Sequence, residues 1–263
     1  HPSVMTRNTL ECCHQTKVGV RMSIAVSDPV HTAAGVSYTA EVQLAEPVRA
    51  WLNAQDGIVA VGDEIDAGRG VADLVAGFSG DAWLPTRSTF ANPLALSVLD
   101  KTQVPIVESQ LRAWAPHGWR SLKRQIIEPL VAGGHLEAFY SEEESAPSYR
   151  ATLNAADPFS SLVAVELKLK DWRRAVAQAG RYRLFAERSF VAMPVTVMSA
   201  NLETEALRNR VGLLSIDSAG GVEVVLEAPT SGPLQPLRRR WAAEQLLSAV
   251  RAPTTRVAGS PIL

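Results

Sequence analysis

The stretch from residue 162 to residue 193 constrains the fold most, because it predicts a strand, a helix and a second strand in direct succession. Leu162–Leu167 is an almost unbroken apolar run rich in β-branched residues, which is typical of a strand buried on both faces. A helix is predicted from Trp172 to about Glu187, where apolar side chains recur at helical spacing. Ser189–Met193 follows as another apolar strand. This succession favours an α/β fold with a covered sheet.

Polar side chains interrupt this pattern where the first strand ends. Glu166 and Lys168 are two residues apart, and alternate residues of a strand share a face. A carboxylate and an ammonium group are therefore predicted to point the same way at the rim of a buried sheet. In the helix that follows, Gln178 and Tyr182 are four residues apart and also share a face. These four side chains form the candidate site.

An acidic residue lies within a second apolar strand, predicted at Val71–Phe78. Burying the carboxylate of Asp73 there is costly unless it is paired or bound to a metal ion. Two other interpretations remain open, in which Asp73 faces water on an edge strand or pairs with Arg69. A helix at 46–55 and a strand at 57–66 are predicted upstream.

Glu166-x-Lys168 followed by Gln178-xxx-Tyr182 resembles the restriction-endonuclease-like, or PD-(D/E)xK, nuclease superfamily, in its branch with a Q-xxx-Y helix. That family needs one more acid on the preceding core strand. Asp73 is the first choice for it, and Asp157 of the Asp157-Pro158 pair is the second. The resemblance covers residues 45–78 and 160–195. It implies an α/β core of the restriction-endonuclease-like kind, with a mixed sheet flanked by helices.

The resemblance also implies roles for the site residues. Asp73, Glu166 and the backbone carbonyl of Leu167 would hold Mg²⁺, for which Mn²⁺ can substitute. Lys168 would orient or deprotonate the attacking water, or steady the phosphate as a point charge. Gln178 and Tyr182 would line the site from the helix. Glu64 can add a carboxylate from the strand before Asp73. Three nearby basic residues are candidates for phosphate contacts: Lys170, Arg174 and Arg181.

Residues 80–159 separate the two acidic strands and predict a structured insertion. The predicted elements are three helices and a hairpin, at Pro93–Lys101, Ile106–Ala115, Gly118–Ala132, His135–Tyr140 and Ser148–Leu153. This layout is typical of a winged helix-turn-helix, whose third helix enters the DNA major groove. The exposed face of the third helix holds the candidate DNA contacts Arg120, Lys123 and Arg124. A solvated helix face and a protein-interaction module remain open, since the hairpin tip 141–147 is acidic.

The C-terminal part of the chain predicts further core elements. A helix is expected at Asn201–Arg210, strands at Val211–Ile216 and Gly221–Glu227, and a closing helix at Leu237–Val250. The basic triplet Arg238–Arg240 is predicted to be exposed at the start of that last helix. The expected domains are a core formed by 22–79 and 160–263, with 80–159 inserted, preceded by a vector-derived or poorly ordered segment at 1–21.

Composition sets limits on location and partners. The chain has a net charge of −1, which counts against a generally basic nucleic-acid protein but allows a local basic face. Its two cysteines, Cys12 and Cys13, are adjacent, which excludes a disulfide framework and makes a reducing cytoplasm the expected location. With His14 they lack the second ligand pair of a structural metal site. Neither a membrane span nor a signal peptide is predicted.

The resulting expectation is a Mg²⁺-dependent DNA endonuclease, which can act as a homodimer because such nucleases often pair to cut both strands. Two other functions stay open. One is a DNA-binding regulator or structural module that keeps the scaffold without the chemistry. The other is an unrelated α/β binding protein. The first two predict DNA binding that weakens steeply as salt rises, and the third predicts none.

Overall fold

A computed structural model of the 263-residue chain describes residues 38–68, 70–79, 88–115, 118–140 and 146–251. The expectations for residues 1–21, for the cysteine pair and for most of the acidic hairpin tip fall outside these ranges. None of the helices within them is both long enough and apolar enough to cross a membrane.

A mixed six-stranded sheet forms the core, with the strand order β1-β2-β6-β7-β8-β9. Its strands are β1 (Ile58–Asp66), β2 (Val71–Phe78), β6 (Ser161–Leu167), β7 (Arg188–Pro194), β8 (Gly212–Ile216) and β9 (Val222–Leu226). The β6–β7 and β7–β8 pairs are parallel, and the other pairs are antiparallel. The predicted α/β class is confirmed, and β6 is buried along most of its length, as its apolar run predicts.

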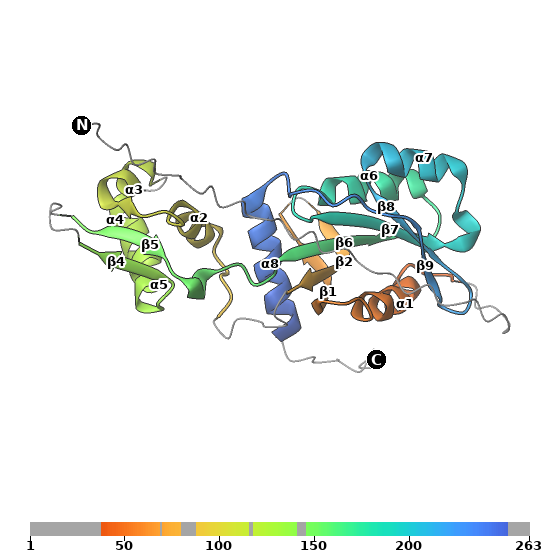
Figure 1. Cartoon of the computed structure of the whole chain (residues 1–263), viewed down its shortest axis with the longest axis horizontal. Coiled ribbons are helices and arrows are strands. Elements are labelled where there is room, and N and C mark those ends of the chain that lie inside the picture. Colours follow the sequence, from red (N-terminus) through yellow and green to blue (C-terminus); the bar gives the residue numbers. More distant parts are fainter. Residues whose placement is uncertain (1–37, 69, 80–87, 116–117, 141–145, 252–263) are drawn as a thin grey trace, which may run out of the picture. The chain divides into compact units, whose positions relative to one another are not determined.

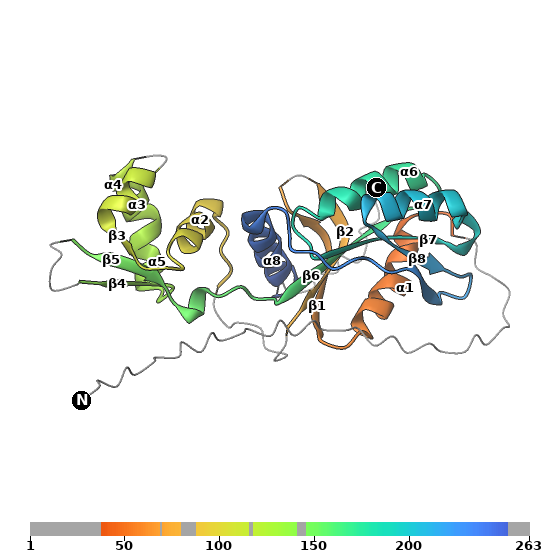
Figure 2. The same ribbon diagram turned by 45° about the horizontal axis from the view of Figure 1, so that its top comes forward.

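Helices cover both faces of this sheet. They are α1 (Val42–Asn53), α6 (Trp172–Tyr182), α7 (Ala200–Asn209) and α8 (Pro236–Arg251). Helix α1 lies on one face, while α6 and α7 lie together on the other (Figures 1 and 2). Leu44, Val48 and Leu52 recur every four residues, so α1 buries one continuous stripe against the sheet. Helix α8 packs on β1 and β2, which places it beside the sheet edge formed by β1.

Two core helices differ from the prediction at one end. Helix α1 begins at Val42 rather than residue 46, so Pro47 lies inside the helix and not in its first turn. Helix α6 ends at Tyr182 rather than near Glu187, and the N–H of Phe185 donates to the carbonyl of Tyr182 in the turn that follows. Phe185 is buried in this turn, so the helical spacing of apolar residues continues past the end of the helix. A prediction from that spacing alone therefore makes the helix too long.

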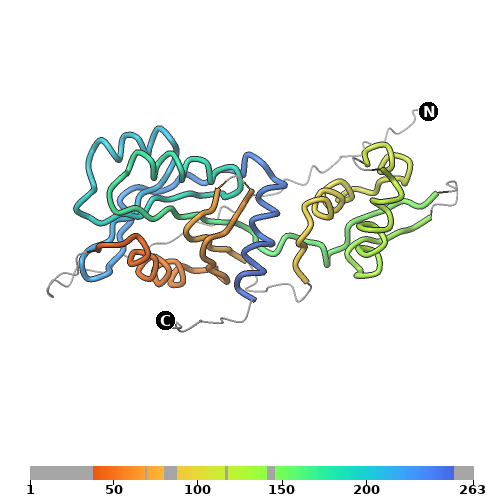
Figure 3. The backbone as a smooth tube through the Cα atoms, turned by 180° about the vertical axis from the view of Figure 1, so that it is seen from behind, coloured from red at the N-terminus to blue at the C-terminus, as the bar shows by residue number. Residues whose placement is uncertain are grey.

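The insertion between β2 and β6 has its own buried core. Its elements are α2 (Pro93–Lys101), β3 (Ile106–Val107), α3 (Glu108–Trp114), α4 (Trp119–Leu122), a π-helical stretch (Lys123–Ile127), α5 (Glu128–Ala132), β4 (Leu136–Phe139) and β5 (Ser148–Ala151). The three strands pair in the order β3-β5-β4. Figure 3 shows the chain returning, in green, from this unit into β6. The predicted second helix is wrong at its start, where Ile106 and Val107 pair with β5 instead.

The basic triplet at the start of α8 is not exposed as predicted. Arg239 and Arg240 are each 8% exposed. Arg239 donates to Glu187 (2.9 Å), to Asp157 and to the carbonyl of Phe159 (2.7 Å), and Arg240 donates to a backbone carbonyl just before β6. Buried cations need such partners, and helical periodicity alone does not reveal them because the partners are distant in sequence.

We expect replacement of Arg239 by methionine to lower the free energy of unfolding by ~3–5 kcal/mol, since it leaves the Asp157 and Glu187 carboxylates without their cation. Urea unfolding followed by circular dichroism measures this loss. The matched control is Arg208→Met on α7, where an exposed ion pair with Glu205 is removed and a change of ~0.5 kcal/mol or less is expected. Equal losses in the two variants would contradict a structural role for the buried network.

Candidate active site

Asp73 and Glu166 lie on neighbouring antiparallel strands, β2 and β6. The register pairs Leu74 with Val165, so its continuation sets Asp73 opposite Glu166. The N–H of Leu167 donates to the Oδ2 atom of Asp73 at 2.7 Å. Strand β2 lies between β1 and β6, so the interpretation of Asp73 as an edge-strand residue is wrong. Arg69, its other proposed partner, is outside the described residues.

The backbone carbonyl of Leu167 faces the same gap between strands as Asp73. In an extended strand the N–H and C=O of one residue point to the same side, and the N–H of Leu167 points at Asp73. The antiparallel pairing between β2 and β6 ends at Leu74 and Val165, so Leu167 lies beyond it. This arrangement leaves three oxygen donors, two carboxylates and one carbonyl, grouped at one end of the paired strands.

Glu166 is the most buried acid of the site, at 1% exposure. Its carboxylate contacts the hydroxyl of Tyr182 and lies 3.3 Å from the Nζ atom of Lys168. The same hydroxyl is 2.8 Å from the carbonyl oxygen of Val71. A phenol carries one proton and can donate to only one of these oxygens at a time. When it donates to Val71, a protonated Glu166 can complete the contact by donating to the phenol oxygen.

The pKa of each acid is raised. Burial is the main cause for Glu166, and the charge of Asp73 adds to it, while the hydrogen bond from Tyr182 and the charge of Lys168 lower it. Burial also raises the pKa of Asp73, against the hydrogen bond from Leu167. The pKa of the Tyr182 hydroxyl is raised by burial and by Glu166. A buried carboxylate beside a half-buried one, both with raised pKa values, favours a bound cation or a bound proton.

Lys168 is held by an acid that was not identified as a site residue from the sequence. Its Nζ atom is 2.8 Å from the Oε2 atom of Glu41, the residue that precedes α1, in addition to its contact with Glu166. Burial works against the ammonium form, but these two carboxylates outweigh it and raise the pKa of Lys168. Lys168 is therefore charged at neutral pH and suited to act as a fixed positive charge. Sequence patterns could not reveal this contact, because Glu41 and Lys168 are more than a hundred residues apart in the chain.

Gln178 lies on α6 one turn before Tyr182, as predicted. Its side-chain oxygen, Oε1, is buried and has no hydrogen-bond partner among the described residues. A buried acceptor without a partner is costly, so this atom is suited to meet a water, an ion or a substrate donor.

Glu64 lies opposite Asp73 in the β1–β2 register, between the Asp63–Leu74 and Ile65–Ala72 pairs. It is exposed, and its φ of +49° places it in the left-handed region, which is uncommon for a residue other than glycine. Its charge contributes to the raised pKa of Asp73. The charge of Glu64 therefore affects the site, but its side chain is exposed to solvent.

The remaining sequence candidates separate into groups. Lys170, Arg174 and Arg181 are exposed at or on α6, and Arg120 and Arg124 are exposed on the insertion. Lys123 differs from these, because it pairs with Glu108 at 3.4 Å. Asp157 precedes β6 and pairs with Arg239, whereas Glu166 stands near the other end of that strand. The second choice for the missing acid is therefore not brought to the site.

The donor set fits a magnesium-type ion. Within the described ranges no three His, Cys, Asp or Glu side chains are grouped to hold a metal ion. The site instead offers the Asp73 and Glu166 carboxylates and the Leu167 carbonyl, all hard oxygen donors. Mg²⁺ is usually bound through one or two carboxylates and keeps several waters, while a structural zinc site needs four protein ligands. The unpartnered Oε1 of Gln178 could accept from one such water.

Comparisons of this chain with protein-family models, with curated proteins and with solved structures found no match.

Proposed function

We propose that this protein is a metal-dependent endonuclease that hydrolyses phosphodiester bonds of DNA. The observation that carries the proposal is the juxtaposition of Asp73 and Glu166 at one end of paired strands, with Lys168 held beside them by a second carboxylate. The order α1-β1-β2-β6-α6-β7, with β2 and β6 antiparallel and β6 and β7 parallel, also supports a restriction-endonuclease-like core.

Each residue of the site has a definite part in this chemistry. Asp73, Glu166 and the carbonyl of Leu167 would hold Mg²⁺, which when bound lowers the pKa of its water and offsets charge on the phosphate. Lys168 stays protonated between Glu41 and Glu166 and so stabilises negative charge on the phosphate. Tyr182 fixes Glu166 in place through its hydroxyl. Gln178 orients a water or a phosphate oxygen through its side-chain amide group.

The insertion would contribute to DNA binding. Its order of helices and strands, α2-β3-α3 followed by the α4–α5 segment and the β4–β5 hairpin, is compatible with a winged helix and supports this part of the proposal. Arg120 and Arg124 are exposed on the third helical segment and are free to meet phosphates or base edges. Lys123 would contribute less, since Glu108 already neutralises it.

The test is cleavage of supercoiled plasmid and labelled duplex oligonucleotides by the full chain in Mg²⁺, in Mn²⁺ and in EDTA. Cutting in both metals and none in EDTA is expected. A Lys168→Ala protein purified in the same way excludes a contaminating nuclease. No cutting together with salt-sensitive DNA binding would replace the proposal with a DNA-binding regulator. Cutting that persists in EDTA would contradict the metal site.

A further inference from the structure

The ammonium group of Lys168 is held from two sides by carboxylates of different elements. Its Nζ atom lies 2.8 Å from the Oε2 atom of Glu41, at the start of α1, and 3.3 Å from the Oε1 atom of Glu166, on β6. Lys168 follows the last residue of β6, and its N–H donates to the carbonyl of Ala192 on β7 at 3.1 Å. The backbone is thus fixed, and the two carboxylates determine where the flexible side chain ends.

The start of helix α1 does not use the Glu41 carboxylate. Glu41 is the N-cap residue, but among the described residues its side chain makes no capping hydrogen bond to the helix. Gln43 stabilises this turn instead, because its Oε1 atom accepts from the N–H groups of Thr39 (2.7 Å) and Ala40 (3.1 Å). The helix is anchored to the sheet by its buried apolar stripe. The contact between Glu41 and Lys168 therefore serves the lysine rather than the helix.

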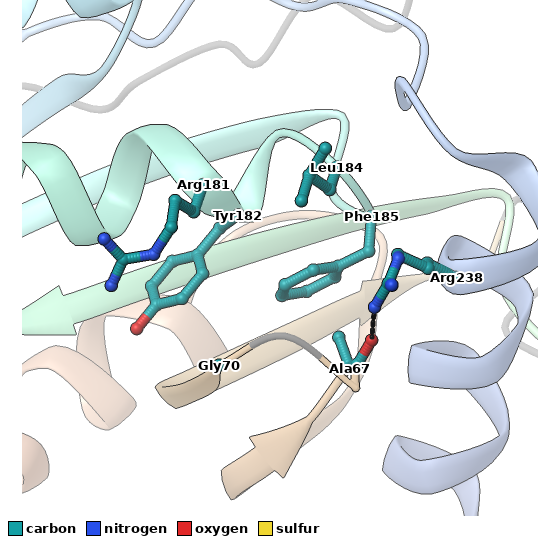
Figure 4. Close-up of a pocket in the computed structure, with 7 residues that line it drawn as sticks. All are labelled: Ala67, Gly70, Arg181, Tyr182, Leu184, Phe185 and Arg238. Carbon is teal, nitrogen blue, oxygen red and sulfur yellow. Dashed lines mark hydrogen bonds between the residues drawn. The ribbon is translucent and has the colours of Figure 1, made fainter.

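The two carboxylate oxygens of Glu166 have different partners. Oε2 contacts the hydroxyl of Tyr182, which Figure 4 shows at the far end of a side chain that extends from α6. Oε1 faces the Nζ atom of Lys168 at 3.3 Å, which is longer than the ~2.7–2.9 Å of a close charge-assisted hydrogen bond. Because Lys168 makes its shorter contact with Glu41, the Oε1 atom keeps room for another cation. It would lose that room if the ammonium group closed on it.

Resting on the proposed nuclease function, we infer that Glu41 is a positioning residue that draws the ammonium group of Lys168 away from Glu166 and does not itself hold the metal ion. The Glu41 side chain is 46% exposed and its Oε2 atom is occupied by Lys168. Without Glu41, Lys168 would pair with Glu166 alone, and its ammonium group would compete with the metal ion for Oε1. Loss of Glu41 should therefore weaken metal binding and slow cleavage only while Lys168 is present.

A double-mutant cycle tests whether Glu41 acts through Lys168. The proteins are full-length wild type, Glu41→Gln, Lys168→Ala and the double variant. Mn²⁺ affinity is measured without DNA, from the electron paramagnetic resonance signal of the free ion, and cleavage is measured as a single-turnover rate. Glu41→Gln is expected to lower each quantity by ~10-fold, the scale of one lost hydrogen bond to a charged group. In the Lys168→Ala background the same replacement should change either quantity by ~2-fold or less.

Glu46→Gln is the matched control, because Glu46 lies on the same helix and its side chain, 84% exposed, pairs with Arg49 instead of the site. It should keep the wild-type metal affinity and rate, and circular dichroism should show the native fold in every variant.

Equal losses from Glu41→Gln with and without Lys168 would overturn the inference, because they would make Glu41 a metal ligand or a direct source of charge at the ion. Wild-type values in the Glu41→Gln protein would overturn it as well. Coupling in Mn²⁺ affinity without cleavage by any of the proteins would keep the positioning of Lys168 at a metal site and remove the nuclease function. If wild type neither binds Mn²⁺ nor cuts DNA, both proposals fail.

Discussion

Replacement of Lys168 by alanine is expected to lower metal-dependent cleavage by ~10²–10³-fold, as the loss of one fixed electrostatic contact at a developing charge does in other enzymes. Lys168 is 15% exposed and is held by both Glu41 and Glu166, so its charge is immobile and poorly screened by solvent. Single-turnover cleavage of a labelled duplex measures the loss. Folding, followed by circular dichroism, and DNA affinity should remain near wild type.

The matched control is Lys170→Ala, which removes the same side chain two residues further on, where it is exposed. Its cleavage rate at saturating DNA should stay within a few-fold of wild type, and only affinity should fall, as for one phosphate contact. Undiminished cutting by the Lys168 variant, or equal losses in the two variants, would remove Lys168 from the site. Unfolding of the Lys168 variant would show that the ion pairs of Lys168 with Glu41 and Glu166 serve to stabilise the fold.

Replacement of Glu166 by glutamine is expected to abolish cleavage and, without metal, to stabilise the protein at neutral pH. The glutamine keeps the shape but removes a buried charge that faces Asp73. The pKa of Glu166 is raised on folding. This carboxyl group therefore favours the folded state when the pH is below its pKa in the unfolded chain. That contribution is lost as the pH rises through the folded pKa. The gain in the variant should therefore be absent in acid and grow toward neutral pH.

Metal addition gives this prediction a second readout. Wild type should gain ~2.7 kcal/mol of stability at a Mg²⁺ concentration of 100 times the dissociation constant, and the Glu166→Gln protein should gain almost nothing. Thermal unfolding in EDTA and in increasing Mg²⁺ measures both effects. Lower stability of the variant in EDTA at neutral pH would show that Glu166 serves mainly as a buried structural partner of Tyr182. An equal Mg²⁺ response in both proteins would place the ion elsewhere.

The strands and the site pattern were accessible from the sequence because they depend on local alternation. The bounds of β2 agree with the prediction, and Glu166 contacts both Lys168 and Tyr182 near the end of β6. What the sequence could not provide depends on pairing between distant segments. Glu41 reaches Lys168 only because α1 packs across the sheet, and its sequence surroundings give no signal for this. The resemblance to a nuclease family itself stays a prediction.

Charge misled the sequence interpretation in one place. The triplet Arg238–Arg240 has the composition of a solvated helix start, yet Arg239 and Arg240 are buried. The start of helix α8 lies against the connection that returns from the insertion to β6, where the carbonyls of Ala155 and Phe159 and the Asp157 carboxylate need donors. The need for donors at these acceptors arises only from the tertiary structure, so no periodic pattern in the sequence indicates it. Arg238, the first residue of the triplet, is half-buried and donates to the carbonyl of Ala67 in the β1–β2 turn.

The insertion occupies the place of a hairpin turn, and this has a consequence for how the protein can change. The N–H of Ser160 donates to the carbonyl of Phe78 at 2.8 Å, so the chain returns to the point from which it left β2. Strand β6 has seven residues, which at ~3.3 Å each puts its acidic end about 20 Å from that point. The register that aligns Asp73 with Glu166 is thus set by the paired strands, not by what their turn carries. A lineage could exchange one inserted module for another at this position while leaving unchanged the end of the hairpin that carries Asp73 and Glu166.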